Sequence, residues 1–376
     1  MKTTRKKFIT QGIYAGMALT GVTALISACG GIRRASLRDT ENMVTAGDIL
    51  PPEKAEILRL ASLAPSGHNS QPWVVKVISP EEWTLCADQS RRLPAVDPDN
   101  RELLLSMGAF LENLSLAAGS LGYAADIRIT ARTPQDTEIA RITVRSDTAR
   151  PYPPGRLSSR STVKQGFLDR ELSRADVRHL SESLQGHCVY FQKGSQHARC
   201  ISEGTVEAFR IQSMRDNAQR ELVQWIRLSS DHARRRMDGL TTESMGITGI
   251  GGLIVRNFMK PEDFLTPGNR QRGIDMTARL AREGAGWMVV TGYPGGAAGL
   301  IETGRRFQRM ALLARERMIA IHPMTQMLEE PSGRQSLRMN HSGNFDPQFI
   351  LRVGYLSSYP EPVSLRRPVS WFVERG

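Results

Sequence analysis

Five polar side chains lie in a short turn-forming segment between two apolar stretches of the chain. The segment, residues 65–73, contains in order Ser66, His68, Asn69, Ser70 and Gln71. Pro65 and Gly67 end the helix that the preceding amphipathic run predicts, and Pro72 keeps the chain extended before the next strand. Polar side chains held in a turn between two buried elements can hydrogen-bond a flat polar ligand. On composition alone, a loop of ordinary turn formers is the alternative interpretation.

Two further segments carry groups that suit an anionic ligand. Residues 160–167 contain Arg160, Ser161, Thr162 and Lys164, and the C-terminal tail contains Arg366 and Arg367 before a proline. A guanidinium group binds phosphate in a bidentate manner, and hydroxyl groups can add further hydrogen bonds. A solvated basic loop is the alternative interpretation of residues 160–167.

Together these segments resemble the nitroreductase family. Residues 64–73 are similar to its flavin-binding signature, A-P-S-x-H-N-x-Q-P-W, and residues 160–167 resemble its R-x-[ST]-x-[KR]-x-x-F segment. Residues 364–368 resemble the family's C-terminal K-x-R-[R]-P, with Ser364 in place of the lysine. The resemblance is strongest to the Acg-like FMN-binding subgroup, in which two nitroreductase-like halves are fused in one chain.

The resemblance implies one FMN per chain, bound between the two halves. It places Pro65, Ser66, Gly67 and Asn69 at the ring or ribityl chain, and it makes His68 a residue that either fixes the loop or contacts the flavin. It assigns Arg160 and Ser161 to the phosphate, Thr162 to the phosphate or ribityl chain, and Lys164 to the N1–O2 edge of the ring. Arg366, with Arg367 close behind, would close on the phosphate. No catalytic side chain is assigned, because the chemistry takes place at N5 of the flavin.

The implied activity is an FMN-dependent oxidoreductase. Reduced FMN would pass hydride or electrons to a flat small-molecule acceptor, such as a quinone or nitroaromatic, with NAD(P)H as the donor usual in the family. The alternative is an FMN-binding or storage protein whose acceptor face is covered by residues 238–252, which are rich in Gly and Thr. A lipid-anchored structural protein with a decayed site is a third interpretation, which the intact spacing around Asn69 and Arg160 disfavours.

The first 29 residues predict an export signal. Lys2, Arg5, Lys6 and Lys7 precede a short apolar run over residues 12–28 that ends in small residues. Residues 26–29 resemble a bacterial lipobox, in which Cys29 is lipidated. Residues 4–9 resemble a twin-arginine motif with Lys6 at the second arginine, so the twin-arginine and general secretory routes both stay open. We therefore expect an exported protein of the cell envelope or periplasm, anchored to the bilayer through Cys29.

The charge and the cysteines of the chain argue against several other classes of function. The chain has 376 residues and a net charge of +12, which is dispersed and lacks an aromatic-interleaved basic stripe, so we do not expect nucleic-acid binding. The four cysteines include no CxxC pair, so neither a metal site nor a redox pair is predicted. Pairing of Cys188 with Cys200 stays open. We expect no obligate protein partner.

The apolar pattern predicts an α+β fold in two halves. After the signal (1–29) and a tether (30–50), the first half covers residues 51–150 and the second covers 151–376. Helices are expected at residues 51–63, 101–121, 173–184, 197–237, 254–259, 271–282 and 298–320. Strands are expected at residues 73–78, 83–87, 125–130, 138–145, 187–192, 286–291 and 349–355.

An internal repeat links the two halves. Residues 108–118 align with residues 304–314, with glycine at the first position and Leu-x-Ala at the end of both. Helical periodicity alone would give part of this match, but the small residues at matched places indicate two central helices packed closely together. We therefore expect a fused pseudo-dimer, in which each half has a mixed or antiparallel sheet packed with helices around a long central helix.

Overall fold

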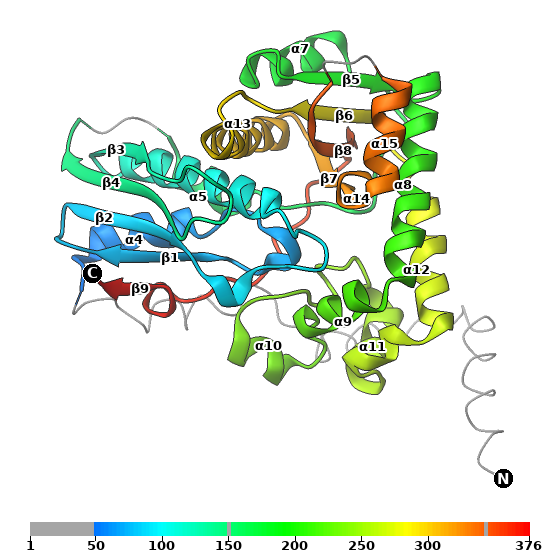
Figure 1. The fold of residues 1–376 in the computed structure, drawn as a ribbon, viewed down its shortest axis with the longest axis horizontal. Coiled ribbons are helices and arrows are strands. Elements are labelled where there is room, and N and C mark those ends of the chain that lie inside the picture. Colours follow the sequence, from blue (N-terminus) through cyan, green and yellow to red (C-terminus); the bar gives the residue numbers. More distant parts are fainter. Residues whose placement is uncertain (1–48, 149–151, 342–344) are drawn as a thin grey trace.

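The structure is a computed structural model that describes residues 49–148, 152–341 and 345–376. The predicted signal, the lipobox at Cys29 and nearly all of the predicted tether lie outside the described residues. The described part contains two β-sheets with helices packed around them (Figure 1).

The first sheet has the strand order β3-β4-β2-β1-β9. Its strands are antiparallel neighbours except for the last pair, β1 and β9, which run parallel. Two helices, α4 and α5, pack with this sheet, and their apolar residues form one core cluster with those of the strands. The bounds are α4 Pro52–Ala61, β1 Trp73–Val77, β2 Glu82–Ala87, α5 Arg101–Ser120, β3 Tyr123–Ile129, β4 Glu138–Ser146 and β9 Val373–Arg375.

The second sheet has the strand order β5-β6-β8-β7, and all of its neighbouring strands are antiparallel. Strand β6 is almost wholly buried, which agrees with its unbroken apolar sequence. Helices α7 and α13 contribute to the core on this sheet. The bounds are α7 Arg174–Ser183, β5 Cys188–Gln192, β6 Gly286–Thr291, α13 Ala297–Glu316, β7 Ile319–Pro323 and β8 Pro347–Tyr355.

The two sheets repeat one order of strands and helices. The order β3-β4-β2-β1 of the first corresponds to β7-β8-β6-β5 of the second, and the long helices α5 and α13 fall at matching places in the chain. The main difference is an insertion between β5 and β6, where the first sheet has only a short turn. The insertion contains α8 Gln196–Met214, α9 Asp216–Trp225, α10 Ser230–Arg236, α11 Gly249–Phe258, η5 Pro261–Leu265 and α12 Pro267–Leu280.

The long helices α5 and α13 cross at two glycines. A Cβ atom on Gly108 would lie 2.0 Å from the carbonyl oxygen of Ile301, and one on Gly304 would lie 2.1 Å from that of Leu105. The shift that aligns Gly108 with Gly304 also aligns Leu105 with Ile301, so the two contacts exchange with each other. Such exchange is typical of two surfaces related by a two-fold axis.

Polar contacts at the crossing also exchange under the alignment of the two helices. Gln308 Nε2 donates to Asn113 Oδ1 at 2.7 Å, and Arg309 pairs with Glu112, whose side chain is only 2% exposed. The alignment pairs Glu112 with Gln308 and Asn113 with Arg309, so these two contacts also exchange. Arg305 lies 3.3 Å from the same carboxylate. The buried Glu112 is therefore compensated by two cations, as a buried charge must be.

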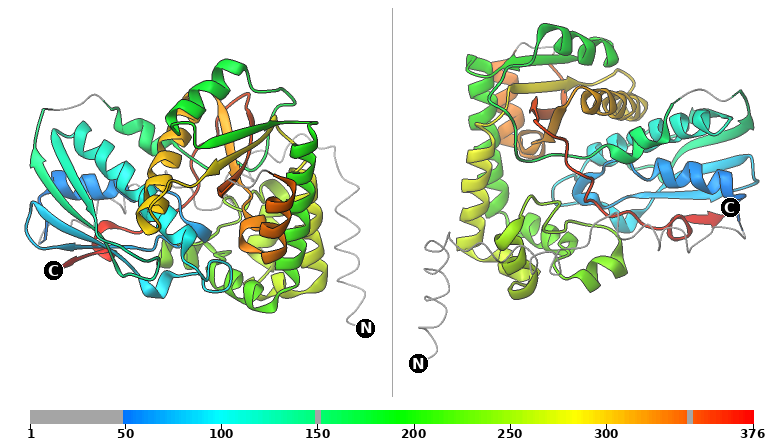
Figure 2. Two further views of the ribbon diagram at one scale, coloured as in Figure 1. Left: turned by 45° about the horizontal axis from the view of Figure 1, so that its top comes forward. Right: turned by 180° about the vertical axis from the view of Figure 1, so that it is seen from behind.

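The C-terminal tail returns to the first sheet. Strand β9 pairs in parallel with β1, with Val75 opposite Val373. Figure 2 (right) shows this tail crossing from the second sheet to the edge of the first. The sequence gives no strand signal there, because β9 is only three residues long. The tail brings residues 364–368 past the turn before β1.

Most predicted elements are confirmed, but the expected helix over residues 298–320 is wrong at its end. Helix α13 stops at Glu316, and β7 begins at Ile319 after Met318 adopts a left-handed conformation with φ 57°. The apolar run there belongs to a buried strand and not to another helical turn. The sequence also missed the short helices α6 Pro154–Ser159, α14 Gln326–Glu329 and α15 Pro331–Asn340.

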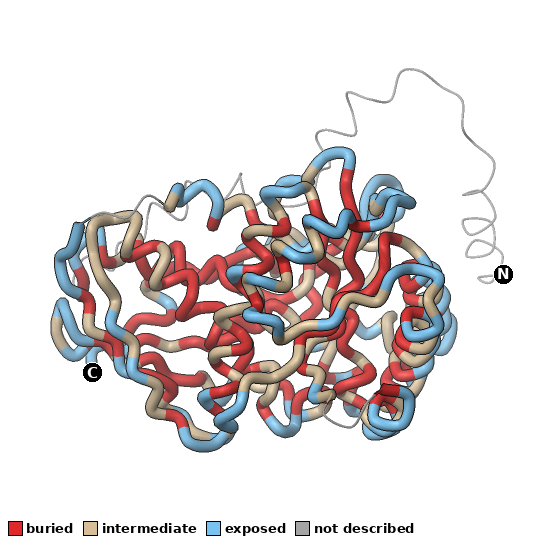
Figure 3. Tube along the Cα trace, turned by 90° about the horizontal axis from the view of Figure 1, so that it is seen from above, coloured by how far each residue is buried: buried red, intermediate tan, exposed pale blue. Residues whose placement is uncertain are grey.

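Helix α5 confirms the expected long buried helix. It is long and apolar enough to cross a membrane. However, 83% of its apolar 18-residue stretch is buried inside the protein, as expected for a core helix. Figure 3 shows the buried trace through the middle of both halves, with exposed residues at the rim.

We expect Gly108→Ala to destabilise the protein by about 1–3 kcal/mol, because the added methyl group meets backbone that cannot move away. Gly251→Ala is the matched control, since a Cβ there has no neighbour within 4 Å. Thermal unfolding followed by circular dichroism would measure both. Equal melting temperatures for the two variants would contradict the close crossing.

Candidate functional site

The turn before β1 is held in an uncommon backbone conformation. A single 3-10 turn, η3 Gly67–Asn69, forms its centre, and His68, Asn69 and Gln71 have φ values of 50°, 54° and 52°. Residues other than glycine rarely adopt positive φ, and they keep it only when their surroundings impose it. Ser66 Oγ accepts a hydrogen bond from the Gln71 amide at 2.9 Å and so closes the turn.

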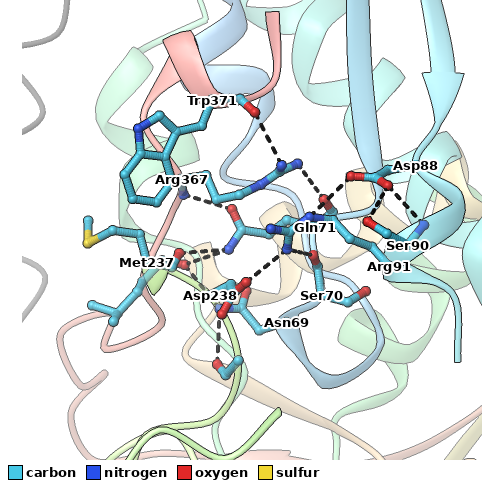
Figure 4. Close-up of polar contacts among 12 residues, drawn as sticks. Asn69, Ser70, Gln71, Asp88, Ser90, Arg91, Met237, Asp238, Arg367 and Trp371 are labelled. Carbon is cyan, nitrogen blue, oxygen red and sulfur yellow. Dashed lines mark hydrogen bonds and ion pairs between the residues drawn. The ribbon is translucent and has the colours of Figure 1, made fainter. Parts of the chain in front are cut away.

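Two side-chain amides connect this turn to distant parts of the chain. Asn69 Nδ2 donates to the carbonyl oxygens of Gly239 and Leu365 at 3.2 and 3.1 Å. Gln71 Nε2 donates to the carbonyl oxygen of Met237 at 2.9 Å (Figure 4). Both side chains are buried. The turn is therefore joined at once to the insertion and to the C-terminal tail.

The tail arginines point into the turn. Arg366 donates to Asn69 Oδ1 at 2.8 Å and to the carbonyl oxygens of Leu63 and Ala64, both at 3.1 Å. Arg367 donates to the carbonyl oxygens of Gln71 and Trp73, at 2.6 and 2.8 Å. The structure thus brings the tail to the signature turn, and the contact of these arginines with a phosphate stays a prediction.

Asp238, the first residue of the predicted cover, is fixed by two arginines. Its buried carboxylate lies 2.8 Å from Arg91 Nη1 and 2.9 Å from Arg227 Nη2. Arg91 also donates to the carbonyl oxygen of Ser70 at 2.8 Å, so the ion pair connects the cover to the turn (Figure 4). A buried carboxylate is tolerated here because it is paired twice.

The basic segment lies against the second sheet. The amide of Val163 donates to Ile321 of β7 at 3.4 Å, and the carbonyl oxygen of Lys164 accepts a 2.6 Å hydrogen bond from Arg352 of β8. The guanidinium of Arg352 also lies over the ring of Phe167, 4.1 Å from its centroid. Arg160 is buried, whereas Thr162 is exposed.

Lys164 of the basic segment lies near enough to His68 of the turn to affect the pKa of the imidazole. Burial lowers the pKa of His68 to about 4, Glu102 opposes this shift, and Lys164 adds to it. Burial alone lowers the pKa of Lys164 to about 8. Within the described ranges, His68 Nε2 is buried and has no hydrogen-bond partner. The predicted turn and the basic segment therefore lie near each other in the structure.

No family model matches this chain. A Mycobacterium tuberculosis protein named "Putative NAD(P)H nitroreductase Rv3131" is 25% identical over 334 residues, which cover 85% of this chain and 90% of that protein. The "Probable NAD(P)H nitroreductase PigM" of Serratia is 38% identical over 73 residues, 18% of this chain and 20% of that one. The "Putative NAD(P)H nitroreductase acg" of M. tuberculosis is 39% identical over 70 residues, 19% and 21% of the two chains.

These similarities support the nitroreductase family for this chain. Among solved structures, the "Nitroreductase-like Family Protein from Bacillus cereus" matches with a TM-score of 0.36 and 12% identity, over 60% of this chain and 97% of that one. The Acg-like subgroup, the fusion of two halves and the FMN contacts stay predictions.

Two glutamates near the turn at residues 65–73, Glu102 and Glu329, were not predicted from the sequence. Glu102, in the first turn of α5, lies next to Gly67, whose Cβ position is 3.4 Å from Glu102 Oε2. Thr325 Oγ1 lies 3.1 Å from Glu102 and 3.0 Å from Glu329. In the sequence, Glu102 looks like an ordinary N-terminal helix acid. Glu329 gave no signal, because no element was expected around it.

Burial raises the pKa of Glu329 to about 8, with a further increase from the nearby Glu102 and opposing contributions from Gln212, Arg101 and Thr325. Glu329 therefore carries a proton at neutral pH, beside the ion pair that Glu102 makes with Arg101 at 2.8 Å. Burial also raises the pKa of Asp97 to about 6.

One groove lies away from this group. It has a volume of about 870 Å³ and is lined by residues of α7, β5 and the segment before α7, among them Glu171, Arg178 and Tyr190. No predicted flavin contact lines it. Cys86, Cys188 and Cys200 are free thiols in the structure, so Cys188 and Cys200 are not paired.

Stability should depend on pH through Glu329. Its pKa is higher in the folded protein than the value of 4.5 expected when unfolded, so the folded state binds the extra proton between those values. The free energy of unfolding should therefore fall as the pH rises from about 5 to 8. In Glu329→Gln this decline should be smaller, whereas the exposed Glu262→Gln should leave it unchanged. Urea titrations across this pH range would measure the slopes, and an unchanged slope in Glu329→Gln would contradict the assignment.

Proposed function

We propose that this chain is an FMN-dependent oxidoreductase of the nitroreductase type, which reduces a flat acceptor such as a quinone or nitroaromatic. The relatives' names support a nitroreductase-type oxidoreductase, and FMN and the acceptor are our inference. The observation that carries the proposal is a pair of buried polar atoms without partners in the described part of the chain, His68 Nε2 in the signature turn and Ser161 Oγ in the basic segment.

The residues present fit an FMN molecule. His68 Nε2 and Ser161 Oγ are buried polar atoms without a hydrogen-bond partner among the described residues. Buried polar atoms are nearly always paired, so orphaned ones point to a ligand. FMN offers carbonyl and ring nitrogen atoms, hydroxyl groups and a phosphate, which are suitable partners for an imidazole, a hydroxyl and an ammonium group.

The chain's own groups have distinct roles in this arrangement. When bound, FMN supplies hydride or electron transfer. Lys164 keeps its positive charge at pH 7 and would stabilise negative charge at the N1–O2 edge of the ring. His68 is neutral at that pH, so it offers one donor and one acceptor nitrogen. Arg160, Ser161 and Thr162 would hold the phosphate and ribityl chain, while Pro65, Ser66, Gly67 and Asn69 would form the opposite wall.

We further propose that the two halves are fused repeats that share one FMN site. The matching strand orders and the exchanging contacts at the α5–α13 crossing support the repeat. The signature turn occurs only in the first half, and the basic segment occurs only in the second. The sequence can therefore form one complete site, so we expect one FMN per chain.

Storage of FMN is a second candidate, because the predicted cover touches both walls of the site. Gly239 at its start exchanges hydrogen bonds with Asn69, whose side chain donates at 3.2 Å. Gly246 accepts a 2.9 Å hydrogen bond from Gln165 of the basic segment. A cover held at its start and at its middle would restrict access of an acceptor to the ring. Residues 249–252, the end of this segment, begin helix α11.

We also propose that the protein is exported and anchored to the envelope bilayer through Cys29, without a nucleic-acid partner. The proposal rests on the signal and lipobox patterns of residues 1–29. An exported protein meets little NAD(P)H, which leaves other reductants of the envelope as alternative donors.

The absorbance spectrum of the purified protein tests the function. We expect a yellow protein with one FMN per chain that bleaches under anaerobic conditions when NAD(P)H is added. Bleaching by dithionite but not by NAD(P)H would favour storage or another donor. A protein that stays colourless after incubation with FMN would contradict the proposal.

Lys164→Met should weaken FMN binding about 10- to 100-fold, because a hydrogen bond to a charged group contributes about 1.5–3 kcal/mol. Lys193→Met is the matched control, since Lys193 is exposed and pairs with Asp169 on the surface. Titration of the apoprotein with FMN, followed by flavin fluorescence, gives both affinities. Equal affinities for the two variants would remove Lys164 from the site.

A further inference from the structure

The two tail arginines are buried in the turn that carries the signature. Arg366 is 4% exposed and Arg367 is 5% exposed. Between them they donate to four backbone carbonyl oxygens of residues 63–73 and to the side chain of Asn69. The five acceptors belong to the segment that follows α4, to the turn itself and to the first residue of β1.

These carbonyl groups need donors that the turn itself cannot supply. A backbone with several residues at positive φ directs its carbonyl groups away from a regular hydrogen-bond ladder, and an unpaired buried carbonyl costs about 1–3 kcal/mol. A guanidinium group offers five N–H donors in one plane, so a single arginine can satisfy several acceptors.

The position of the tail is fixed independently of any ligand. Strand β9 pairs with β1, and the backbone amide of Arg367 donates to Gln71 Oε1 at 2.9 Å. The Arg367 guanidinium also lies over the ring of Phe372, 5.6 Å from its centroid. Burial lowers the pKa of Arg367 to about 9, so the protein gives up solvation of this charge to place it here.

We propose that Arg366 and Arg367 are positioning residues that set the conformation of the flavin-facing turn, and that the phosphate is held instead by the segment around Arg160. This inference rests on the proposed function for its flavin contacts. It makes the tail part of the site although the tail touches the turn and not the ligand. Loss of either arginine should then weaken binding of the whole flavin and not binding of its phosphate in particular.

Binding of FMN and of riboflavin, which lacks the phosphate, separates the two roles. We expect Arg366→Gln to weaken both affinities by the same factor, about 10-fold or more, so that their ratio stays within twofold of the unsubstituted protein. Arg160→Gln should weaken FMN alone and bring its affinity towards that of riboflavin. Arg270→Gln is the control, since Arg270 also donates to two backbone carbonyl groups but lies in the insertion. It should change neither affinity.

Amide hydrogen exchange on the full chain without flavin tests the same role independently of binding. Exchange at residues 65–73 should accelerate at least 10-fold in Arg366→Gln, while exchange in α5 stays unchanged. Arg366→Lys should restore only part of the protection, because an ammonium cannot reach three acceptors in one plane. Unchanged exchange at residues 65–73, or a loss of FMN affinity with riboflavin affinity intact, would overturn the proposal. If the unsubstituted protein binds neither flavin, the proposed function fails, and the exchange result alone decides the role of the arginine.

Discussion

The hydrogen bonds that hold residues 65–73 decide how the rest of the site is arranged. This turn has three residues other than glycine at positive φ, and its carbonyl and amide groups find their partners in segments hundreds of residues away in the chain. Because Arg366 and Arg367 come from the tail and Met237 and Gly239 from the insertion, hydrogen bonds with both of these segments hold the turn. The ion pairs of Asp238 with Arg91 and Arg227 fasten the insertion to the same point.

The crossing of α5 and α13 sets the distance between the turn at residues 65–73 and the basic segment at residues 160–167. Glu102, in the first turn of α5, lies beside Gly67, and β7, which follows α13, accepts a hydrogen bond from the basic segment at Ile321. Gly108 and Gly304 let the helix backbones touch, which fixes the halves relative to each other with little freedom. Paired polar contacts around Glu112 and Gln308 add specificity to this packing.

Local patterns in the sequence were sufficient for much of the fold. The apolar repeat of α5 and the alternation in β3 and β4 predicted those elements because their signals lie within a few residues. The expected helix end near Ala320 failed because the apolar residues of β7 continue the helical pattern of α13. Strand β9 was missed because its partner β1 is almost three hundred residues away, and three residues carry no usable periodicity.

The candidate site was likewise predicted from the sequence only in part. The turn and the basic segment were predicted from residue types and spacing, and in the structure Lys164 lies near enough to His68 to affect its pKa. Glu102, Thr325 and Glu329 could not be found, because their importance lies in mutual distance and burial, which no local pattern encodes. The tail arginines were found as charged residues, but only the structure reveals that their donors face carbonyl groups of the turn.

A crystal structure of the chain grown with FMN tests the central claim most directly, since it locates the ring. The account predicts a single flavin per chain, with its ring between the turn at residues 65–71 and Lys164, and its phosphate near Arg160. Density for the flavin in the groove between α7 and β5, or a phosphate paired with Arg366 after that side chain has left the turn, would contradict it.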